Sequence, residues 1–156
     1  MNLRKNIGVR MTSIYLVVSI ALINSCAFSA KPIYFDKEIT VAERAASRFH
    51  ELHNQQNFRA IYDLLDKQSH PSAPENVLSE IRANYDKLGQ SLESRLVEKK
   101  AFPSPGPGYT SRVKLAYETK FEKGDWTEFF AWNIRDSNEA MLVEYLLEPT
   151  TRSPNR

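Results

Sequence analysis

The chain has 156 residues, a length typical of a single domain. It carries 21 basic and 19 acidic residues, for a formal net charge of +2. The basic residues form no block, so nucleic acid is not an expected partner. Cys26 is the single cysteine, which excludes an internal disulfide.

The first 29 residues have the pattern of a secretory signal peptide. Arg4, Lys5 and Arg10 are followed by the apolar stretch from Met11 to Ile23. This stretch is short for a membrane span, which needs roughly 20 apolar residues, but it suits a signal peptide. Without this segment the chain has 18 basic and 19 acidic residues. We therefore predict an exported protein of a bacterial envelope, periplasmic or membrane-anchored; an uncleaved anchor is the alternative.

Two fates are open for Cys26. The preceding residues, LINSC over 22–26, resemble the segment that a lipoprotein peptidase reads, with Asn24 as the poor fit. Lipidation there would attach the protein to a membrane, because each buried CH₂ of an acyl chain contributes roughly 0.8 kcal/mol. An ordinary signal-peptidase cut, with either Ser25 and Ala27 or Ala27 and Ser29 as the small-residue pair, would instead discard Cys26.

Three helices are predicted after a linker over residues 30–40. Helical periodicity begins at Ile39, with an apolar stripe of Val41, Ala42, Ala45, Phe49 and Leu52. Asn57 is expected to cap a second, shorter helix. A third helix has capping-box spacing between Ser72 and Glu75, Pro74 in its first turn and Gly89 as its C-terminal cap.

After Gly89 the hydrophobic period changes to two, which predicts four strands. Their expected ranges are 91–102, 109–121, 126–135 and 141–147, joined by a proline-glycine loop and two turns. The second strand is the clearest, with one face made of Val113, Leu115, Tyr117, Thr119 and Phe121. Residues 149–156 are expected to form a disordered tail. Three N-terminal helices and a four-stranded antiparallel meander predict an α+β domain over 41–148.

This element order resembles the NTF2-like, cone-shaped α+β fold, with the helices packed on a curved sheet. Within that fold the chain is similar to an uncharacterised bacterial exported family, domain of unknown function 4019. The resemblance rests on Leu88-Gly89 followed by Ser94-Arg95, on the loop into Gly108-Tyr109, and on the strand end YETKF at 117–121. It implies an envelope protein whose fold often encloses a pocket, and it implies no catalytic residue.

The last strand departs from the family pattern. Tyr145 is present, but Glu144 precedes it where the family has glycine, and Met141 stands near the position of a tryptophan. This departure concerns the subfamily rather than the fold.

The predicted third strand contains the candidate for acid–base chemistry, Glu128. Alternation places Trp126, Phe130 and Trp132 on its face. A carboxylate among aromatic side chains is how a general acid or base with a raised pKa is made. The structural alternative is a position at the strand end or an ion pair with Lys120 or Arg112. A buried Glu128 within hydrogen-bonding reach of Tyr117 or Tyr145 would favour an enzyme, and an exposed one would exclude it.

Two histidines, His50 and His53, have i, i+3 spacing on the first predicted helix. This spacing could in principle hold a metal, but it is not the HExxH pattern of zinc hydrolases. Since Leu52 belongs to the core stripe, we expect both histidines at the surface beside it, and neither a metal nor a cofactor is predicted.

The opposite face of the last two strands is also apolar. Its residues are Phe129, Ala131, Leu142 and Leu146. Antiparallel sheets usually leave one face in water, so we expect a covering element or a homodimer through this face. A β-bulge that changes the phase within a strand would remove the argument.

The leading functional hypothesis is a non-enzymatic small-ligand-binding or accessory protein of the cell envelope. Its pocket for a small apolar ligand would involve Tyr117, Trp126, Phe130, Trp132 and Tyr145. The alternatives are a small isomerase-like or hydrolase-like enzyme that uses Glu128, and a protein-binding module that acts through the outer sheet face.

Overall fold

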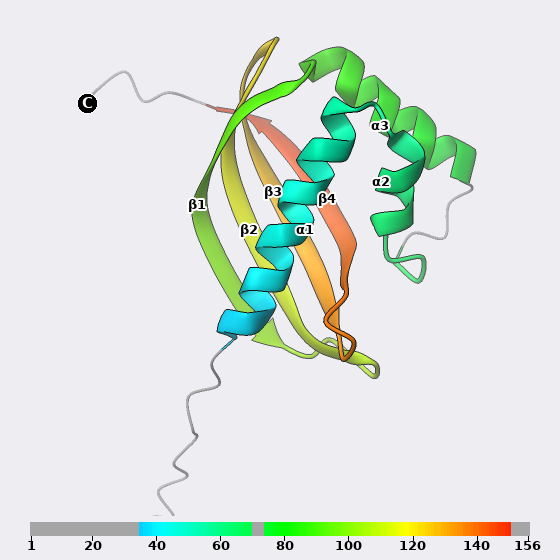
Figure 1. Ribbon diagram of the computed structural model, residues 1–156, viewed down its shortest axis with the longest axis vertical. Coiled ribbons are helices and arrows are strands. Elements are labelled where there is room, and N and C mark those ends of the chain that lie inside the picture. The colour runs from blue at the N-terminus through cyan, green and yellow to red at the C-terminus, as the bar shows by residue number, and fades with distance from the viewer. Residues whose placement is uncertain (1–34, 70–73, 151–156) are drawn as a thin grey trace, which may run out of the picture. The chain divides into compact units, whose positions relative to one another are not determined.

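The computed structural model describes residues 35–69 and 74–150, all within one compact unit. The predicted signal peptide with Cys26, the start of the linker, the Ser72 cap and the tail beyond residue 150 lie outside these ranges. The described residues form three helices followed by a four-stranded antiparallel sheet, which confirms the α+β arrangement (Figure 1). None of the helices in the described ranges has the length and apolar character that a membrane crossing requires.

The first helix, α1, spans Asp36–Asn54. It begins before Ile39, so residues 36–40 of the expected linker form its first turns. Asp36 and Glu38 lie in the first turn, where acidic side chains interact favourably with the helix dipole. The buried side of α1 consists of Val41, Ala42, Ala46, Phe49, Leu52 and His53.

The other two helices begin and end where local sequence signals indicate. In α2, Phe58–Leu64, the Asn57 side chain accepts a hydrogen bond from the N–H of Ala60 at 3.2 Å. The third helix, α3, spans Pro74–Leu88 and starts at a proline, whose missing N–H would be unpaired there in any case. Gly89 follows at a φ of +74° and donates its N–H to the carbonyl of Tyr85. Asn57 and Gly89 are thus confirmed as caps.

The sheet is a meander of β1 (Ser91–Pro103), β2 (Tyr109–Phe121), β3 (Gly124–Arg135) and β4 (Ala140–Pro149). Neighbouring strands pair antiparallel in the order β1-β2-β3-β4. We call the face that packs against α1 the inner face and the opposite face the outer face. Helix α1 lies across the inner face, and α2 and α3 lie towards β4 (Figure 1).

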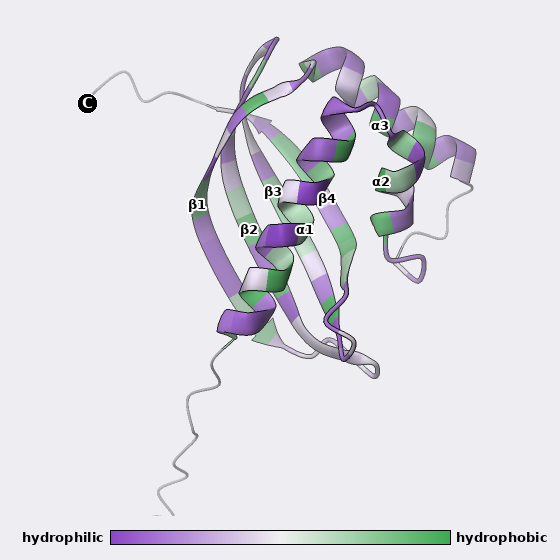
Figure 2. Ribbon diagram, in the orientation of Figure 1, coloured by the Kyte–Doolittle hydropathy of each residue, from purple (hydrophilic) through white to green (hydrophobic). Residues whose placement is uncertain are grey.

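The core lies between α1 and the inner face. Alternation along β2 and β3 brings apolar side chains to this face, and hydrophobic and hydrophilic segments alternate along the sheet and α1 (Figure 2). Among the fully buried side chains of this core, the largest are Trp132, Phe130, Leu52, Ile61, Leu115 and Ile134. Phe130 and Trp132 therefore occupy the predicted face of β3.

A bulge in β4 corrects one expectation about the outer face. Trp132 pairs with Leu142 and Ala131 pairs with Glu144, so Val143 is an extra residue on β4. The bulge changes the phase of the strand and places Leu142 in the inner core, where it is 1% exposed. Leu142 therefore does not share the outer face with Phe129. Leu146, which pairs with Phe129, remains on the outer face and is 51% exposed.

Candidate functional site

Glu128 lies on the inner face of β3 and is fully buried. Its Oε1 accepts a hydrogen bond from the Tyr145 hydroxyl at 2.7 Å. Its Oε2 lies 2.7 Å from His50 Nε2 and also accepts a hydrogen bond from the Thr119 hydroxyl. Because a carboxylate only accepts, His50 donates in this pair. We call these four residues the Glu128 network; they come from α1, β2, β3 and β4.

The strand register explains why these side chains meet. Tyr117 pairs with Glu128, so Thr119 lies two residues along β2 on the same face. Tyr145 pairs with Phe130, two residues along β3 from Glu128, so it too is a diagonal neighbour. His50 completes the network from α1, across the interface between the helix and the sheet.

The cross-strand ion pairs considered for Glu128 do not form. Lys120 pairs in register with Asp125, out of phase with Glu128 along both strands. The Arg112 side chain donates from Nε to the amide oxygen of Asn133 at 2.9 Å. His50 is the positively chargeable partner of Glu128.

The electrostatics of the Glu128 network favour a charged carboxylate. Burial alone would raise the pKa of Glu128, but the hydrogen bonds from His50, Thr119 and Tyr145 and the His50 charge outweigh it and lower this pKa. Burial and the neighbouring carboxylate raise the pKa of Tyr145 well above its ordinary value. Glu128 is thus a weak base and Tyr145 a weak acid, and each is held in its hydrogen bond at neutral pH.

A cavity of about 160 Å³ lies between α1, α2, α3 and β4. We call it the helix-side cavity. Its walls are mostly apolar, and its polar lining residues are His53, Glu80, Asn84 and Tyr145. Glu128 is not among the lining residues, although its partner Tyr145 is. The cavity therefore reaches Tyr145 but not the carboxylate to which it is bonded.

His53 is the unusual residue of this cavity. It is 2% exposed, and among the described residues neither ring nitrogen has a hydrogen-bond partner. Its ring stacks on Phe49 and contacts Tyr85 and Phe121. Burial lowers the pKa of His53 below its ordinary value of 6.5, and this effect is larger than the opposing effects of the Glu128 charge and the neighbouring Asn54 side chain. At neutral pH it is an uncharged imidazole with one donor and one acceptor available.

The structure brings only one of the five predicted pocket residues to this cavity, namely Tyr145. Phe130 and Trp132 stack on each other within the core. Tyr117 packs edge-on against His50, and burial, followed by the charges of Glu43 and Glu128, raises its pKa to about 12. Trp126 lies beneath Lys87 of α3, with Nζ 4.2 Å from the ring centroid.

The expectation that both histidines lie at the surface is wrong. His53 is buried, and the His50 side chain is 14% exposed and bonded to Glu128. A signal for His53 was present in the sequence, since Ala42, Ala46, Phe49 and His53 follow one another at steps of four, three and four. No such signal links His50 to Glu128, because 78 residues separate them.

A second buried polar cluster lies around Asp66, which the sequence did not indicate. Asp66 Oδ2 accepts hydrogen bonds from the Tyr109 hydroxyl at 2.9 Å and the Asn133 amide at 3.1 Å. The N–H of Asp66 donates to the carbonyl of Leu142, so the chain after α2 pairs with β4. These hydrogen bonds hold Leu65, which follows α2, beside Leu142 of β4, and both residues line the helix-side cavity.

Comparisons with protein-family models, curated proteins and solved structures find no match to this chain.

Proposed function

We propose that this chain is an exported envelope protein that binds a small ligand non-covalently in the helix-side cavity. The observation that carries this proposal is His53, a buried imidazole whose two ring nitrogens have no hydrogen-bond partner among the described residues. It lies at the wall of a cavity that six apolar and three further polar residues line. A buried polar group without a hydrogen bond costs about 1–3 kcal/mol. A ligand that provides the missing hydrogen bond would recover that cost.

The cavity limits the size and chemistry of the ligand. Its volume of about 160 Å³ is close to that of a roughly 150 Å³ apolar cavity that binds benzene in another protein. Apolar side chains such as Phe49, Ile61 and Ile81 suit a ring or a short hydrocarbon. Neutral His53 suits a hydroxyl or carbonyl group on it. We therefore infer a neutral, single-ring or similarly small molecule with one polar group.

The Glu128 network favours binding over acid–base catalysis. An effective general base has a pKa near the working pH and a free lone pair directed at the substrate. The pKa of Glu128 is lowered, and both carboxylate oxygens already accept hydrogen bonds. Within this proposal Glu128 has a positioning role, because it holds Tyr145 at the cavity wall.

A small isomerase-like or hydrolase-like enzyme remains the second candidate. The complete burial of Glu128 and its hydrogen bond to Tyr145 are the observations that favour it. The two candidates differ in what happens to a bound ligand. Mass spectrometry of a ligand retained after purification, followed over time with added protein, separates them: an unchanged mass supports binding, and conversion that Glu128→Gln abolishes supports an enzyme.

Binding can be tested with phenol as the probe, since it combines one ring with one hydroxyl. Calorimetric titration should show saturable binding, and NMR should show shifts of the His53 ring nitrogens. Ile81→Trp enlarges a side chain that lines the cavity and should weaken binding at least about tenfold, because the larger ring takes up part of the ligand volume. Val97→Phe adds similar volume on β1 at a residue that is 42% exposed, and should leave binding unchanged. Equal binding by both variants would place the phenol elsewhere.

Export, membrane attachment and family membership form part of the same proposal. The basic and apolar N-terminal segment supports cleavage and export, and the LINSC segment supports lipidation at Cys26. The order of three helices and a four-stranded meander supports the NTF2-like fold and the family of unknown function 4019. Intact-mass measurement of protein from the envelope fraction tests the modification, since Cys26→Ser should remove the acyl mass and the membrane-bound fraction.

A further inference from the structure

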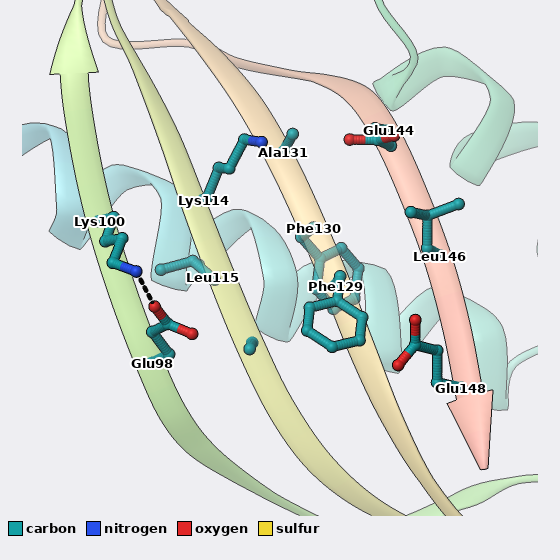
Figure 3. A pocket seen from close by; sticks show the side chains of 11 residues that line it. Glu98, Lys100, Lys114, Leu115, Phe129, Phe130, Ala131, Glu144, Leu146 and Glu148 are labelled. Carbon is teal, nitrogen blue, oxygen red and sulfur yellow. Dashed lines mark ion pairs between the residues drawn. The ribbon is translucent and has the colours of Figure 1, made fainter. Parts of the chain in front are cut away.

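A shallow groove of about 290 Å³ lies on the outer face, away from the helix-side cavity (Figure 3). Its floor is formed by Ala116 and Ala131, which are small and almost fully buried. Phe129 and Leu146 pair across β3 and β4 beside this floor, and half of Leu146 is exposed. A second hollow adjoins the first, and the two share the lining residues Lys114, Ala131, Glu144 and Leu146. We call the two hollows together the outer groove.

Opposite charges lie on the two sides of the outer groove. Lys114 on β2 and Glu144 on β4 both pair with Ala131 of β3, so two strand spacings, or about 10 Å, separate their Cα atoms. The Lys114 side chain reaches towards Ala131 from one side, and the Glu144 carboxylate lies on the other (Figure 3). Within the described part of the chain, neither side chain has an ion-pair partner. The two charges therefore do not neutralise each other directly, and a small ligand could bridge them.

The cationic side of the outer groove includes Arg112, which two buried residues hold in place. Arg112 lines the second hollow beside Lys114. Its Nε donates to the amide oxygen of Asn133 at 2.9 Å, and the Asn133 amide nitrogen donates to Asp66 at 3.1 Å. Asn133 is 3% and Asp66 1% exposed. Among the described residues, the two terminal nitrogens of Arg112 have no hydrogen-bond partner. A guanidinium fixed in this way presents donors whose planar geometry matches a carboxylate.

We propose that the outer groove binds a free α-amino acid with an apolar side chain. Such a molecule carries a carboxylate and an ammonium group on the same carbon. The carboxylate lies against Lys114 and Arg112, and the ammonium group lies against Glu144. The apolar side chain then covers the alanine floor and contacts Phe129 and Leu146, which lie in the next row of the sheet.

The other charged residues that line the outer groove are compatible with this orientation. Lys100 pairs in register with Lys114, and like charges directly opposite each other repel, so an anion beside Lys114 is favoured. Glu98 forms an ion pair with Lys100. Glu148 pairs in register with Thr127, in the row beyond Leu146, so it lies away from the carboxylate of the ligand.

Calorimetric titration of L-leucine into the protein recovered after expression of the full chain tests this site. The wild type should bind leucine saturably, with a dissociation constant below about 10 mM. Glycine has the same charges without the apolar side chain and should bind at least about threefold more weakly. Lys114→Gln and Glu144→Gln should each weaken leucine binding at least about threefold. Lys37→Gln and Glu51→Gln make the same changes at exposed positions of α1 and should leave it unchanged.

Leucine analogues that lack one charge assign each contact and show that the variants are folded. Leucinamide has no carboxylate, so Lys114→Gln should weaken the binding of leucine but not that of leucinamide. N-acetylleucine has no ammonium group, so Glu144→Gln should weaken the binding of leucine but not that of N-acetylleucine. Ile81→Trp alters the helix-side cavity and should leave leucine binding unchanged.

Four outcomes would overturn the proposal. The first is the absence of saturable leucine binding up to about 10 mM. The second is an unchanged leucine affinity in either of the charge variants Lys114→Gln and Glu144→Gln. The third is equal binding of glycine and leucine, which would mean that the apolar row is not used. The fourth is a loss of leucine binding in Ile81→Trp, which would place leucine in the helix-side cavity.

Discussion

The Tyr145 hydroxyl donates a 2.7 Å hydrogen bond to Glu128, while the Tyr145 side chain forms part of the helix-side cavity wall. One tyrosine therefore connects a buried charge to a candidate binding site. The position of that wall depends on three strands and α1, since Glu128 is also held by Thr119 and His50. The Glu128 network and the cavity are consequently expected to respond together to substitution.

Tyr145→Phe should lower the free energy of unfolding by about 1–3 kcal/mol. The substitution keeps the ring but removes the donor for Oε1 of a fully buried carboxylate. Urea unfolding at pH 7 measures the change. Tyr62→Phe is the matched control, because the Tyr62 ring stays beside Lys67 and Arg59 and the change should fall within about 0.5 kcal/mol. Equal effects at the two positions would contradict the role of Tyr145.

Glu128→Gln should lower the free energy of unfolding at pH 7 by about 2 kcal/mol or more, since a charged acceptor of three hydrogen bonds is replaced by a neutral amide. The folded state lowers the pKa of Glu128 below 4.5. The charged carboxylate therefore stabilises the fold above about pH 4.5, and this contribution is lost as the pH falls through the lower, folded-state pKa. Urea unfolding from pH 7 to pH 3 should show wild type and variant converging in acid.

Glu51 provides the control for Glu128, because it is exposed and its carboxylate forms an ion pair with Arg48, three residues away. Glu51→Gln should change stability by less than about 0.5 kcal/mol at pH 7. If the difference between wild type and Glu128→Gln stayed constant down to pH 3, the carboxylate would not be the group whose charge stabilises the fold.

The elements of this fold were predictable because each has a local signal. The turn at Asp136–Asn138, the cap at Asn57 and the alternation along β2 depend on residues close together in the sequence. The inner face of β3 followed from the same alternation. Element type and order therefore matched the expectation, and the start of α1 differed because its first turns are too polar to show the apolar period.

The candidate site was less predictable because it depends on contacts between distant segments. The bulge at Val143 moved Leu142 to the inner face, and no proline or glycine marks it in the sequence. His50 meets Glu128 only because α1 crosses β3 at that point. The helix-side cavity forms where α2 and α3 pack near β4. The apolar period of a single helix shows which face is buried, but it does not show which other element that face packs against.

Gly89→Ala should lower the free energy of unfolding by about 1–2 kcal/mol. Gly89 has a φ of +74°, and an added Cβ would lie 2.8 Å from the Cβ of Glu122. Gly106→Ala is the control, since its added Cβ meets nothing within 4 Å and its φ lies outside the left-handed region. Urea unfolding should show no loss for Gly106→Ala. A similar loss for both variants would mean that backbone strain at the end of α3 is not the cause.

His53→Leu should separate stability from binding. Replacing a buried, unpartnered imidazole by an apolar side chain should leave the free energy of unfolding at pH 7 unchanged or raise it by about 1 kcal/mol. Phenol binding should weaken at least about tenfold.

The stability of the wild type should also depend on pH through His53. Because burial lowers the pKa of His53, the unfolded chain takes up this proton at a higher pH than the folded chain. The free energy of unfolding of the wild type therefore falls as the pH drops below about 6.5. The variant lacks that group, so its advantage in urea unfolding should grow between pH 7 and pH 5. A variant that is destabilised at pH 7 and still binds phenol would show that His53 is a packing residue.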